Sequence, residues 1–327
     1  MKLLRLFLYL ACCGLFAVLI GGYFGAVHPA LDTLSHLRLH AAGLAVLLGL
    51  ALAMSGGFLG GLSLTVSALL ILVTTIRPYM IVEAAATDGN ADRAVYRLMQ
   101  VNLRFDNQVP NEIVRLIGET NPDIITADEV SAQWRPRLEA LRHLYPHQLY
   151  CESPDFVGGV AILSRRPFAP DQSQGCSNLG AMATQVIDFG GRPVLVGAMH
   201  LDWPWPFYQP YLLNDMGPQL KAVALSALPS ILSGDFNAVS WSYAMRRVEQ
   251  ESETRQALYD GGSWLHHALP ASWIKWLGLP IDHVLVSDID VRSIATLQPA
   301  GSDHLPVLME FSVPDRPEKA VETVLSD

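Results

Sequence analysis

The feature that most constrains this chain is a stretch of 38 residues, 39–76, without a single Asp, Glu, Lys or Arg side chain. A Ser-Gly-Gly sequence at residues 55–57 can turn the chain near the middle of this stretch. An earlier apolar stretch, residues 3–27, carries its one charge at Arg5. Since about 20 apolar residues suffice for a helix to cross a bilayer, the pattern predicts three transmembrane helices. Their expected bounds are residues 3–27, 39–55 and 57–76.

Two other interpretations of this apolar region, residues 1–80, fit the pattern less well. One is a buried hydrophobic hairpin of a soluble domain. The other is a cleaved signal peptide that begins at Lys2 and Arg5, but no A-x-A cleavage site follows cleanly. The same two basic residues place the amino terminus in the cytoplasm, so three crossings bring the rest of the chain out on the opposite face. Cleavage of the first segment would leave two crossings and the same location.

Charge divides the 327 residues into two regions. Residues 1–80 carry four basic and one acidic side chain, whereas the remaining 247 carry 18 basic and 30 acidic ones, a net charge of −12. This acidic balance argues against a protein that holds duplex DNA by counterion release alone, because that requires a basic face. Four cysteines without a CxxC pair exclude a zinc ribbon. Cys151 and Cys176, the two in the acidic region, can form a disulfide in an oxidising compartment or remain separate buried thiols.

The acidic region follows a predicted linker at residues 81–94 and alternates short strands with helices. The expected helices are 111–120, 131–144 and 211–227, and the expected strands are 96–103, 123–127, 147–151, 159–164, 183–189, 193–200, 229–233, 281–286 and 305–311. Many neighbouring strands have no helix between them, so we predict an α/β domain at 95–313 with two packed sheets and outer helices. Residues 314–327 are expected to form a polar tail.

Polar side chains at the ends of apolar segments are the strongest functional signal in this domain, because strand ends direct such groups into a shared cleft. They are Asn102, Asp128, Glu129, His200, Asp235, Asn237, Asp282, Asp303 and His304. Each alone has an ordinary structural interpretation, such as a helix cap, an Asx turn or a buried histidine. Their recurrence at successive strand ends weakens that interpretation for the set.

Several of these residues lie in longer motifs, namely GDFN at 234–237, IDHVLVS at 281–287 and SDHLPV at 302–307, with GGVAILSRRP at 158–167. In this order, and over about residues 96–312, they resemble the endonuclease/exonuclease/phosphatase superfamily. That superfamily includes deoxyribonuclease I, apurinic endonucleases, neutral sphingomyelinases and inositol-polyphosphate 5-phosphatases. The resemblance is greatest to its membrane-anchored bacterial branch. It implies a four-layer α/β sandwich in a membrane-anchored bacterial protein. With the three crossings expected above, we predict a multi-pass protein of the bacterial inner membrane with the catalytic domain on the periplasmic side.

The resemblance also implies roles for single residues in phosphoester hydrolysis. The metal side would be formed by Glu129, Asn102 and Asp303, around Mg²⁺ or Mn²⁺, with no other cofactor. The catalytic groups would be His200, Asp235, Asn237, Asp282 and His304. In this assignment Asp235 orients or deprotonates water, Asn237 donates to a phosphate oxygen, and His304, aligned by Asp282, contacts the scissile phosphate. His200 is a phosphate contact or the leaving-group acid. Whether Asp235 or a histidine is the base stays open.

Three features depart from the family pattern. Asp128 stands where Gln usually precedes the metal-binding Glu, and we interpret it as a helix cap rather than a metal ligand. His283 occupies a position that is often aromatic, and its role is open. The pair His266-His267 lacks an acid or Cys at zinc-ligand spacing, so we interpret it as part of a loop.

The sequence therefore predicts a membrane-anchored, metal-dependent hydrolase of phosphodiesters or phosphomonoesters. The substrate class stays open between nucleic acid, a small phosphate ester and a lipid headgroup. Aromatic residues at 203–208, directly after His200, favour the lipid alternative if they are exposed and not packed as a rigid Pro-rich loop. The remaining alternative is a non-catalytic binding domain at the membrane. The bilayer is the expected partner of residues 1–80, and no protein partner can be inferred.

Overall fold

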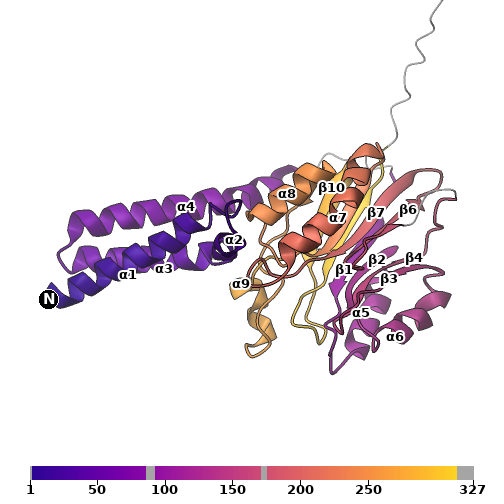
Figure 1. Ribbon diagram of the computed structural model, residues 1–327, viewed down its shortest axis with the longest axis horizontal. Helices are drawn as coiled ribbons and strands as arrows, with labels where there is room; N and C mark the ends of the chain where they lie inside the picture. Colours follow the sequence, from indigo (N-terminus) through magenta and orange to yellow (C-terminus); the bar gives the residue numbers. More distant parts are fainter. Residues whose placement is uncertain (1, 86–92, 171–174, 315–327) are drawn as a thin grey trace, which may run out of the picture.

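The computed structural model describes residues 2–85, 93–170 and 175–314. Half of the predicted linker (86–92) and most of the predicted polar tail (315–327) lie outside these residues. Three long helices run side by side and project from one end of the molecule, and we call them the N-terminal bundle (Figure 1). They are α1 (Lys2–Gly21), α3 (Arg38–Met54) and α4 (Phe58–Ala85). Residues 93–314 form the C-terminal domain at the other end.

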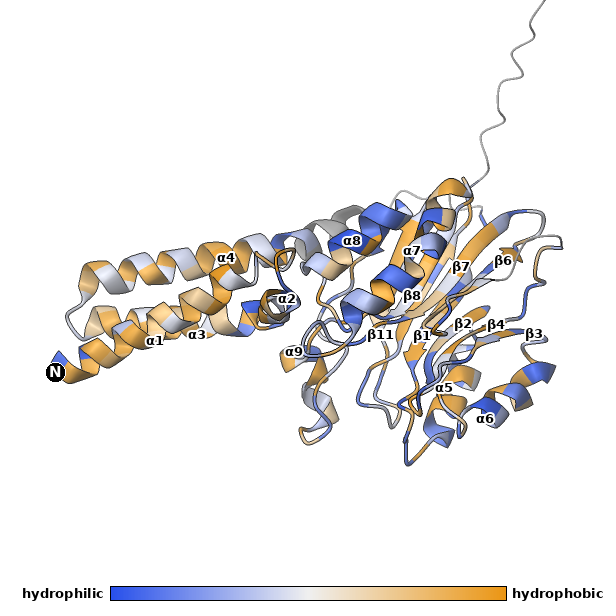
Figure 2. Ribbon diagram, viewed as in Figure 1, coloured by the Kyte–Doolittle hydropathy of each residue, from blue (hydrophilic) through white to orange (hydrophobic). Residues whose placement is uncertain are grey.

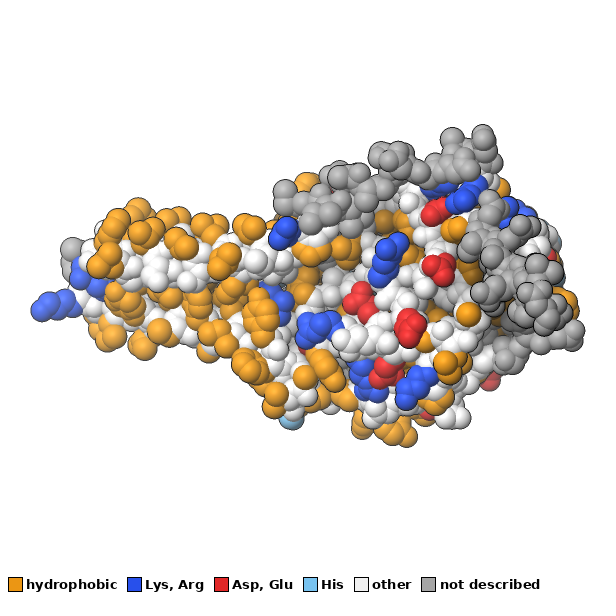
Figure 3. All heavy atoms as spheres, turned by 90° about the horizontal axis from the view of Figure 1, so that it is seen from above, with side chains coloured by type: hydrophobic (Ala, Val, Ile, Leu, Met, Phe, Trp, Pro, Cys, Tyr) orange, Lys and Arg blue, Asp and Glu red, His pale blue; other side chains and the backbone are white. Residues whose placement is uncertain are grey.

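The bundle has the length and composition of membrane-spanning segments. Among the described residues, two helical stretches are long and apolar enough to cross a membrane, Lys2–Gly21 and Phe58–Pro78. A third span results if α3 is counted together with the short helix before it, from which it bends by 62°. Apolar side chains cover the outside of the bundle, whereas hydrophilic segments are concentrated on the C-terminal domain (Figures 2 and 3). These helices suggest that the protein associates with a membrane.

The bundle differs from the sequence-based expectation in two places. Helix α4 continues to Ala85, nine residues beyond the expected end at Ile76, so the first part of the predicted linker is helical. The segment between the first two expected spans contains a helix, α2 (Pro29–His36). Its start has ordinary helix signals, since Pro29 is at the first helical position and the His28 side chain accepts a hydrogen bond from the Ala30 amide.

Two six-stranded mixed sheets form the centre of the C-terminal domain. The first has the order β11-β12-β1-β2-β4-β3 and the second the order β5-β6-β7-β8-β10-β9. The first sheet contains β1 (Tyr96–Asn102), β2 (Ile124–Val130), β3 (His147–Cys151), β4 (Gly159–Ser164), β11 (Asp290–Thr296) and β12 (Val307–Ser312). The second contains β5 (Gly175–Cys176), β6 (Met182–Asp188), β7 (Pro193–His200), β8 (Ser230–Asp235), β9 (Arg255–Ala257) and β10 (Asp282–Ser287).

Helices on the outer faces complete the predicted four-layer α/β sandwich (Figure 1). The main helices are α5 (Asn111–Thr120) and α6 (Arg135–Ala140) on the first sheet, α7 (Gln209–Leu225) and α8 (Tyr243–Ser252) on the second, and the short α9 (Ile274–Leu277) near α2. Apolar residues from both sheets, such as Leu98 and Val196, form the central core. Leu116 of α5 and Leu220 of α7 belong to the two outer cores.

Each sheet contains one parallel pair, β1–β2 in the first and β7–β8 in the second, while its other neighbours are antiparallel. The carboxyl ends of the two strands in a parallel pair meet at one edge of the sheet. In register, Asn102 lies beside Asp128, and His200 lies beside Asp235. The two parallel pairs therefore place four of the predicted polar residues at strand ends, two in each sheet.

A disulfide joins Cys151 at the end of β3 to Cys176 in β5, with the two Cα atoms 5.5 Å apart. It connects an edge strand of the first sheet to an edge strand of the second. Of the two alternatives that the sequence leaves open, the structure has the bonded pair.

Candidate active site

The close approach of β7 and β8 explains the glycine of the GDFN motif. A Cβ atom on Gly234 would lie 1.7 Å from the carbonyl oxygen of Met199, so only glycine fits there. This approach places His200 and Asp235 on adjacent strands, with His200 Nε2 3.9 Å from Asp235 Oδ2. Asp282, at the start of β10, pairs with Asp235 from the other side. Asp235 is thus flanked by both partners within one sheet.

Asn102 links the two sheets across the site. Its Nδ2 donates to Glu129 Oε1 and to Asp235 Oδ2, each over 3.0 Å. Its own Oδ1 accepts a hydrogen bond from the Arg104 amide, which fixes the orientation of the side-chain amide. Asn102 therefore holds a carboxylate of each sheet in place.

A β-bulge in β2 gives Glu129 its position. The strand register shifts between Ala127 and Val130, and Glu129 has a left-handed backbone with φ 57°. Neighbouring side chains of a regular strand point to opposite faces, whereas a bulge can redirect one of them. Here Glu129 reaches Asn102 and Asp128 reaches the backbone of Asp235, so both acids contact the same site. The left-handed conformation costs about 1 kcal/mol or more, which marks Glu129 as a constrained position.

Asp282 and His304 form a buried ion pair. His304 Nδ1 donates to Asp282 Oδ2 over 2.8 Å, and the other ring nitrogen lies 3.6 Å from Asp235 Oδ2. Burial disfavours the charged imidazole, but Asp282 and Asp235 outweigh burial and raise the pKa of His304 to about 10. Burial likewise raises the pKa of Asp282, yet the nearby imidazolium outweighs it, so that the net pKa is lowered. The pair is therefore ionised at neutral pH.

The pKa values of Asp235 and His200 are also shifted, and both are raised. Burial raises the pKa of Asp235 to about 7, although His304 and His200 both oppose this shift. For His200, burial acts to lower the pKa, but Asp235, Glu129 and Asp128 together raise it. An acid that titrates near neutrality beside two histidines whose pKa values are raised is suited to proton transfer.

Gln100 and Asp128 lie behind these groups and contact them. The sequence-based interpretation of Asp128 was wrong. Asp128 was interpreted as a helix cap, but it is fully buried, and its Oδ2 accepts hydrogen bonds from Gln100 Nε2 and the Asp235 amide. Burial raises the pKa of Asp128 well above its ordinary value. Gln100 also donates to Asp282 over 2.9 Å. Gln100 and Asp128 thus hold Asp235 and Asp282 at a fixed separation.

Comparison with known proteins identifies the family. Residues 99–304 match the model of the Endonuclease/Exonuclease/phosphatase family. The chain belongs to this family. A comparison with curated proteins found no similar sequence.

Solved structures share the fold of the C-terminal domain. An endonuclease/exonuclease/phosphatase from Beutenbergia cavernae has 21% identity and a TM-score of 0.51, over 68% of this chain and 72% of that one. The protein of the same description from Bacteroides vulgatus has 16% identity and a TM-score of 0.54, over 68% and 100%. The human Nocturnin catalytic domain, solved with a bound sulfate anion, has 20% identity and a TM-score of 0.50, over 68% and 96%. At these identities the likeness shows the fold alone.

The acids and histidines of this family domain include two groups with the spacing of metal ligands. Within the described residues, one ligand atom each of Glu129, His200 and Asp235 lies within 4.8 Å of the others, and the same holds for Asp235, Asp282 and His304. The carboxylate oxygens of Glu129 and Asp235 in the first group are ligands that suit a hard divalent cation. In addition, the buried Asp128 Oδ1 has no hydrogen-bond partner in the part of the chain that the structure describes. The residues therefore fit a metal site.

The other predicted residues lie nearby with different contacts. Asn237 donates from Nδ2 to the Leu201 carbonyl and to Asp235 Oδ2, so this amide already has two partners inside the protein. Asp303 lies in neither group of metal-ligand spacing, and its Oδ2 accepts from Trp264 Nε1 over 3.2 Å. The roles assigned to Asn237 and Asp303 therefore stay predictions.

Sequence reasoning missed the residues that support the GDFN loop from behind. Three side chains contact its backbone carbonyls: Gln209 Nε2 donates to Phe236 and Asn237, His283 Nε2 lies 2.8 Å from Ala238 O, and His36 Nε2 lies 3.1 Å from Asn237 O. His283, whose role was open, thus supports the loop. His36 could not have been found, because it lies 201 residues away in the apolar region. The pair His266-His267 is stacked in a loop, as expected.

Proposed function

We propose that this protein is a membrane-anchored, divalent-metal-dependent hydrolase of phosphate esters, with its catalytic domain on the face of the membrane opposite the amino terminus. One observation carries the proposal. The carboxyl ends of the two parallel strand pairs bring Asn102, Glu129, His200 and Asp235 to the Asp282–His304 ion pair. A purely structural polar cluster would not need an acid with a pKa near 7 beside two histidines with raised pKa values.

Glu129 would hold a Mg²⁺ or Mn²⁺ ion, with Asn102 and Asp303 on the same side of the site. Such an ion neutralises charge on the phosphate group and favours ionisation of water. Glu129 is suited to this role because it is only partly buried and keeps its position through the Phe105 amide, which donates to its Oε2 over 2.7 Å.

The protein's own residues supply the proton chemistry. His304, held protonated by Asp282, would donate a hydrogen bond from Nε2 to a phosphate oxygen and stabilise the charge that develops there. Asp235 would orient the attacking water and take its proton, because an acid with a pKa near 7 is half ionised at neutral pH. His200, on the other flank of Asp235, would protonate the leaving oxygen.

The arrangement of the bundle supports the proposed topology. The amino terminus lies at the far end of the bundle from the C-terminal domain (Figure 1). Helices α1, α3 and α4 run alternately toward and away from the domain, as three crossings require. The disulfide Cys151–Cys176 also fits an oxidising compartment. Together with the bacterial resemblance, this supports a location in the inner membrane with the domain in the periplasm.

The test is hydrolysis by the purified full chain in detergent, with Mg²⁺ or Mn²⁺ added after treatment with a chelator. We expect metal-dependent release of p-nitrophenol from bis(p-nitrophenyl) phosphate or p-nitrophenyl phosphate, and loss of this activity in Asp235→Asn. Plasmid DNA, a single-stranded oligonucleotide and lipid phosphodiesters are assayed in parallel at one salt concentration. A folded protein that hydrolyses none of them with either metal would instead support the non-catalytic binding domain.

A further inference from the structure

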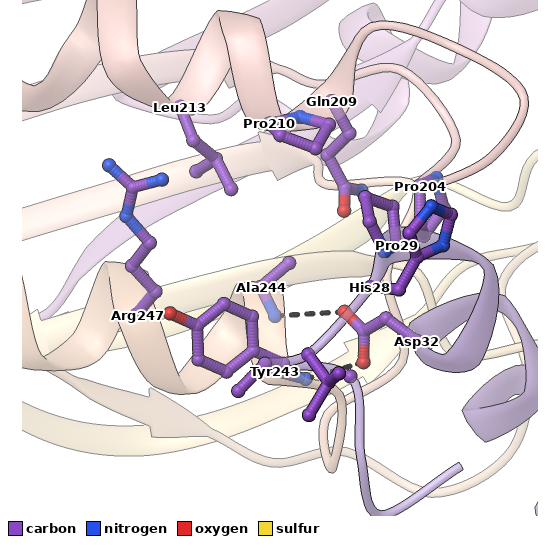
Figure 4. Close-up of a pocket in the computed structure, with 13 residues that line it drawn as sticks. His28, Pro29, Asp32, Pro204, Gln209, Pro210, Leu213, Tyr243, Ala244 and Arg247 are labelled. Carbon is purple, nitrogen blue, oxygen red and sulfur yellow. Dashed lines mark hydrogen bonds between the residues drawn. The ribbon is translucent and has the colours of Figure 1, made fainter. Parts of the chain in front are cut away.

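The short helix α2 connects the first two helices of the bundle and packs directly onto the C-terminal domain. Asp32 accepts hydrogen bonds from the amides of Tyr243 (2.7 Å) and Ala244 (3.0 Å) at the start of α8 (Figure 4). Trp241 Nε1 donates to the carbonyl of Ser35 over 2.8 Å. A cavity of about 170 Å³ lies beside these contacts and is lined by both parts of the molecule (Figure 4). The domain is therefore fixed to the end of the bundle by specific polar contacts.

The same contacts lie next to the candidate active site. His36, buried in α2, contacts the carbonyl of Asn237 and packs against the ring of Trp203, with the ring centroids 5.0 Å apart. Trp203 in turn packs edge-on against Trp264, whose ring contacts His304. A continuous path of packed rings therefore runs from α2 to the Asp282–His304 pair. This side of the site faces the end of the bundle.

Two segments on this side carry large apolar side chains that the protein leaves exposed, and we call them the rim. The rim consists of Trp205, Phe207, Tyr208, Trp273, Trp276 and Leu277. Trp276 is 80% exposed and Tyr208 72%. One segment is bonded to α2, because Thr33 Oγ1 donates to Trp205 O, and the other is bonded to the start of α3, because His40 Nε2 lies 3.0 Å from Leu277 O. An exposed aromatic cluster of this kind marks an interaction surface.

What covers the rim can be inferred from its position beside the N-terminal bundle. The rim adjoins the end of helices whose outer faces are apolar along their length (Figures 2 and 3). Trp and Tyr concentrate where a bilayer meets water, since their rings are apolar and their edges can hydrogen-bond. Lys and Arg side chains gather near the same junction (Figure 3), where they can pair with anionic headgroups.

We infer that the rim rests in the headgroup layer of the membrane that holds the bundle, so that the active site opens toward the bilayer surface and takes a phosphate ester carried by a lipid. The bilayer contact stands on the rim and α2 alone, whereas the substrate class rests on the proposed hydrolase function. The α2 contacts hold the domain against the bilayer, and the path of packed rings runs from α2, which is bonded to the rim, to His304. A soluble ester would reach the same site without using the rim.

The distribution of tryptophan allows the bilayer contact to be tested without any activity. All seven tryptophans lie outside residues 1–80, so their fluorescence reports on the C-terminal domain alone. The full chain is reconstituted into vesicles of phosphatidylcholine with or without acyl chains brominated near the headgroups. We expect bromine to quench the wild type, and to quench Trp205→Phe/Trp276→Phe less, with Trp273 as the rim tryptophan that remains. The control Trp134→Phe, which removes a fully buried ring, should be quenched as much as the wild type. Equal emission from both kinds of vesicle, or undiminished quenching in the double variant, would overturn the contact.

The substrate class is tested by kinetics on the same vesicles. A lipid phosphodiester with a chromogenic headgroup is compared with water-soluble bis(p-nitrophenyl) phosphate. For Trp205→Ser/Trp276→Ser we expect kcat/KM on the lipid ester to fall about tenfold or more, with the soluble ester unaffected. The control Leu225→Ser, which removes an 85% exposed side chain at the far end of α7, should change neither rate.

The outcomes separate the two proposals. Hydrolysis of the soluble ester without hydrolysis of the lipid ester by the wild type would overturn the substrate class and leave the hydrolase function standing. An equal loss of kcat/KM on both esters in Trp205→Ser/Trp276→Ser would show that the substitutions disturb the fold. The rim would then not act through contact with the membrane. No hydrolysis of either ester would overturn the hydrolase function and with it the substrate class, while the quenching experiment still decides the bilayer contact.

Discussion

Asp235 is the residue at which the two halves of the site meet. Its Oδ2 accepts from Asn102 of the first sheet and from Asn237 of its own loop, and it lies 3.6 Å from His304 and 3.9 Å from His200. Its backbone amide donates to Asp128. Because these contacts come from both sheets, small relative movements of the sheets would change the surroundings of this one carboxylate.

Two substitutions distinguish the proposed metal-binding role of Glu129 from the proposed phosphate contact of His304. In Glu129→Ala, loss of a carboxylate ligand should raise the Mn²⁺ concentration needed for half-maximal activity by about tenfold or more. In His304→Ala, loss of a transition-state contact should lower kcat by about 100-fold or more, with metal affinity nearly unchanged. Metal titration of activity and calorimetric metal binding check both variants. If His304→Ala retained the wild-type rate, the assignment of the Asp282–His304 pair would be wrong.

The ion pair also predicts a dependence of stability on pH. The pKa of His304 rises from 6.5 to about 10 on folding, so its contribution to the free energy of unfolding is complete below pH 6.5 and is lost as the pH rises through about 10. The stability difference between wild type and His304→Gln should therefore shrink from pH 6.5 to pH 10. Thermal unfolding followed by near-ultraviolet circular dichroism measures it. A difference that grew over this range would contradict the ionised pair.

At the scale of helices and strands, the sequence predicted elements with strong local patterns. The expected bounds of α5, β3, β4 and β7 agree with the structure. Helix α8 and strands β9 and β11 were not predicted. β11 consists of partly buried and exposed residues, none of them fully buried, and α8 is largely polar. Their positions depend on contacts with distant segments, which a local pattern does not contain.

The residues of the candidate site also divide into those with a local sequence signal and those whose contacts lie far away in the sequence. Polar residues directly after buried strands were found, because the strand pattern and the family motifs coincide there. Asp128 was misassigned, since a register shift in β2 decides where it points. Asp32 and His36 were missed because their partners lie about two hundred residues away. Contacts between the apolar region and the GDFN loop become visible only in three dimensions.

Helix α2 makes a testable contribution to stability. Asp32→Ala would remove both side-chain acceptors at the start of α8, which should cost about 1–2 kcal/mol. We expect a lower unfolding temperature for the full chain in detergent. Asp260→Ala is the matched control, because the Asp260 side chain is 93% exposed with a single ion pair at 3.9 Å. Equal unfolding temperatures for Asp32→Ala and wild type would show that α2 does not hold the domain.

The disulfide should stabilise the domain through the loop that it closes. Cys151 and Cys176 are 25 residues apart, for which chain entropy predicts about 3 kcal/mol. Cys151→Ser/Cys176→Ser should therefore unfold at lower temperature than the wild type. Thiol titration of the denatured, unreduced wild type should find only Cys12 and Cys13. Four reactive thiols would mean that the bond does not form in the cell.

For the whole molecule, the three proposed crossings would fix which face of the membrane carries each connection. Alkaline phosphatase, which folds only outside the cytoplasm, should be active when fused after Asp327 in a Gram-negative host. The matched fusion after Ser55, beyond the end of α3, should be inactive because two crossings return the chain to the cytoplasm. Reversed activities would overturn the three-span topology.

The position of α2 early in the chain has a consequence for synthesis. His36 leaves the ribosome 201 residues before Asn237, and at about 5–20 residues per second this is a wait of about 10–40 s. During that time the first helices can insert, while Asp32 and His36 have no partner. With the proposed topology, the apolar helices would therefore be in place before the C-terminal domain is complete, and newly made chains should gain activity only where they are inserted.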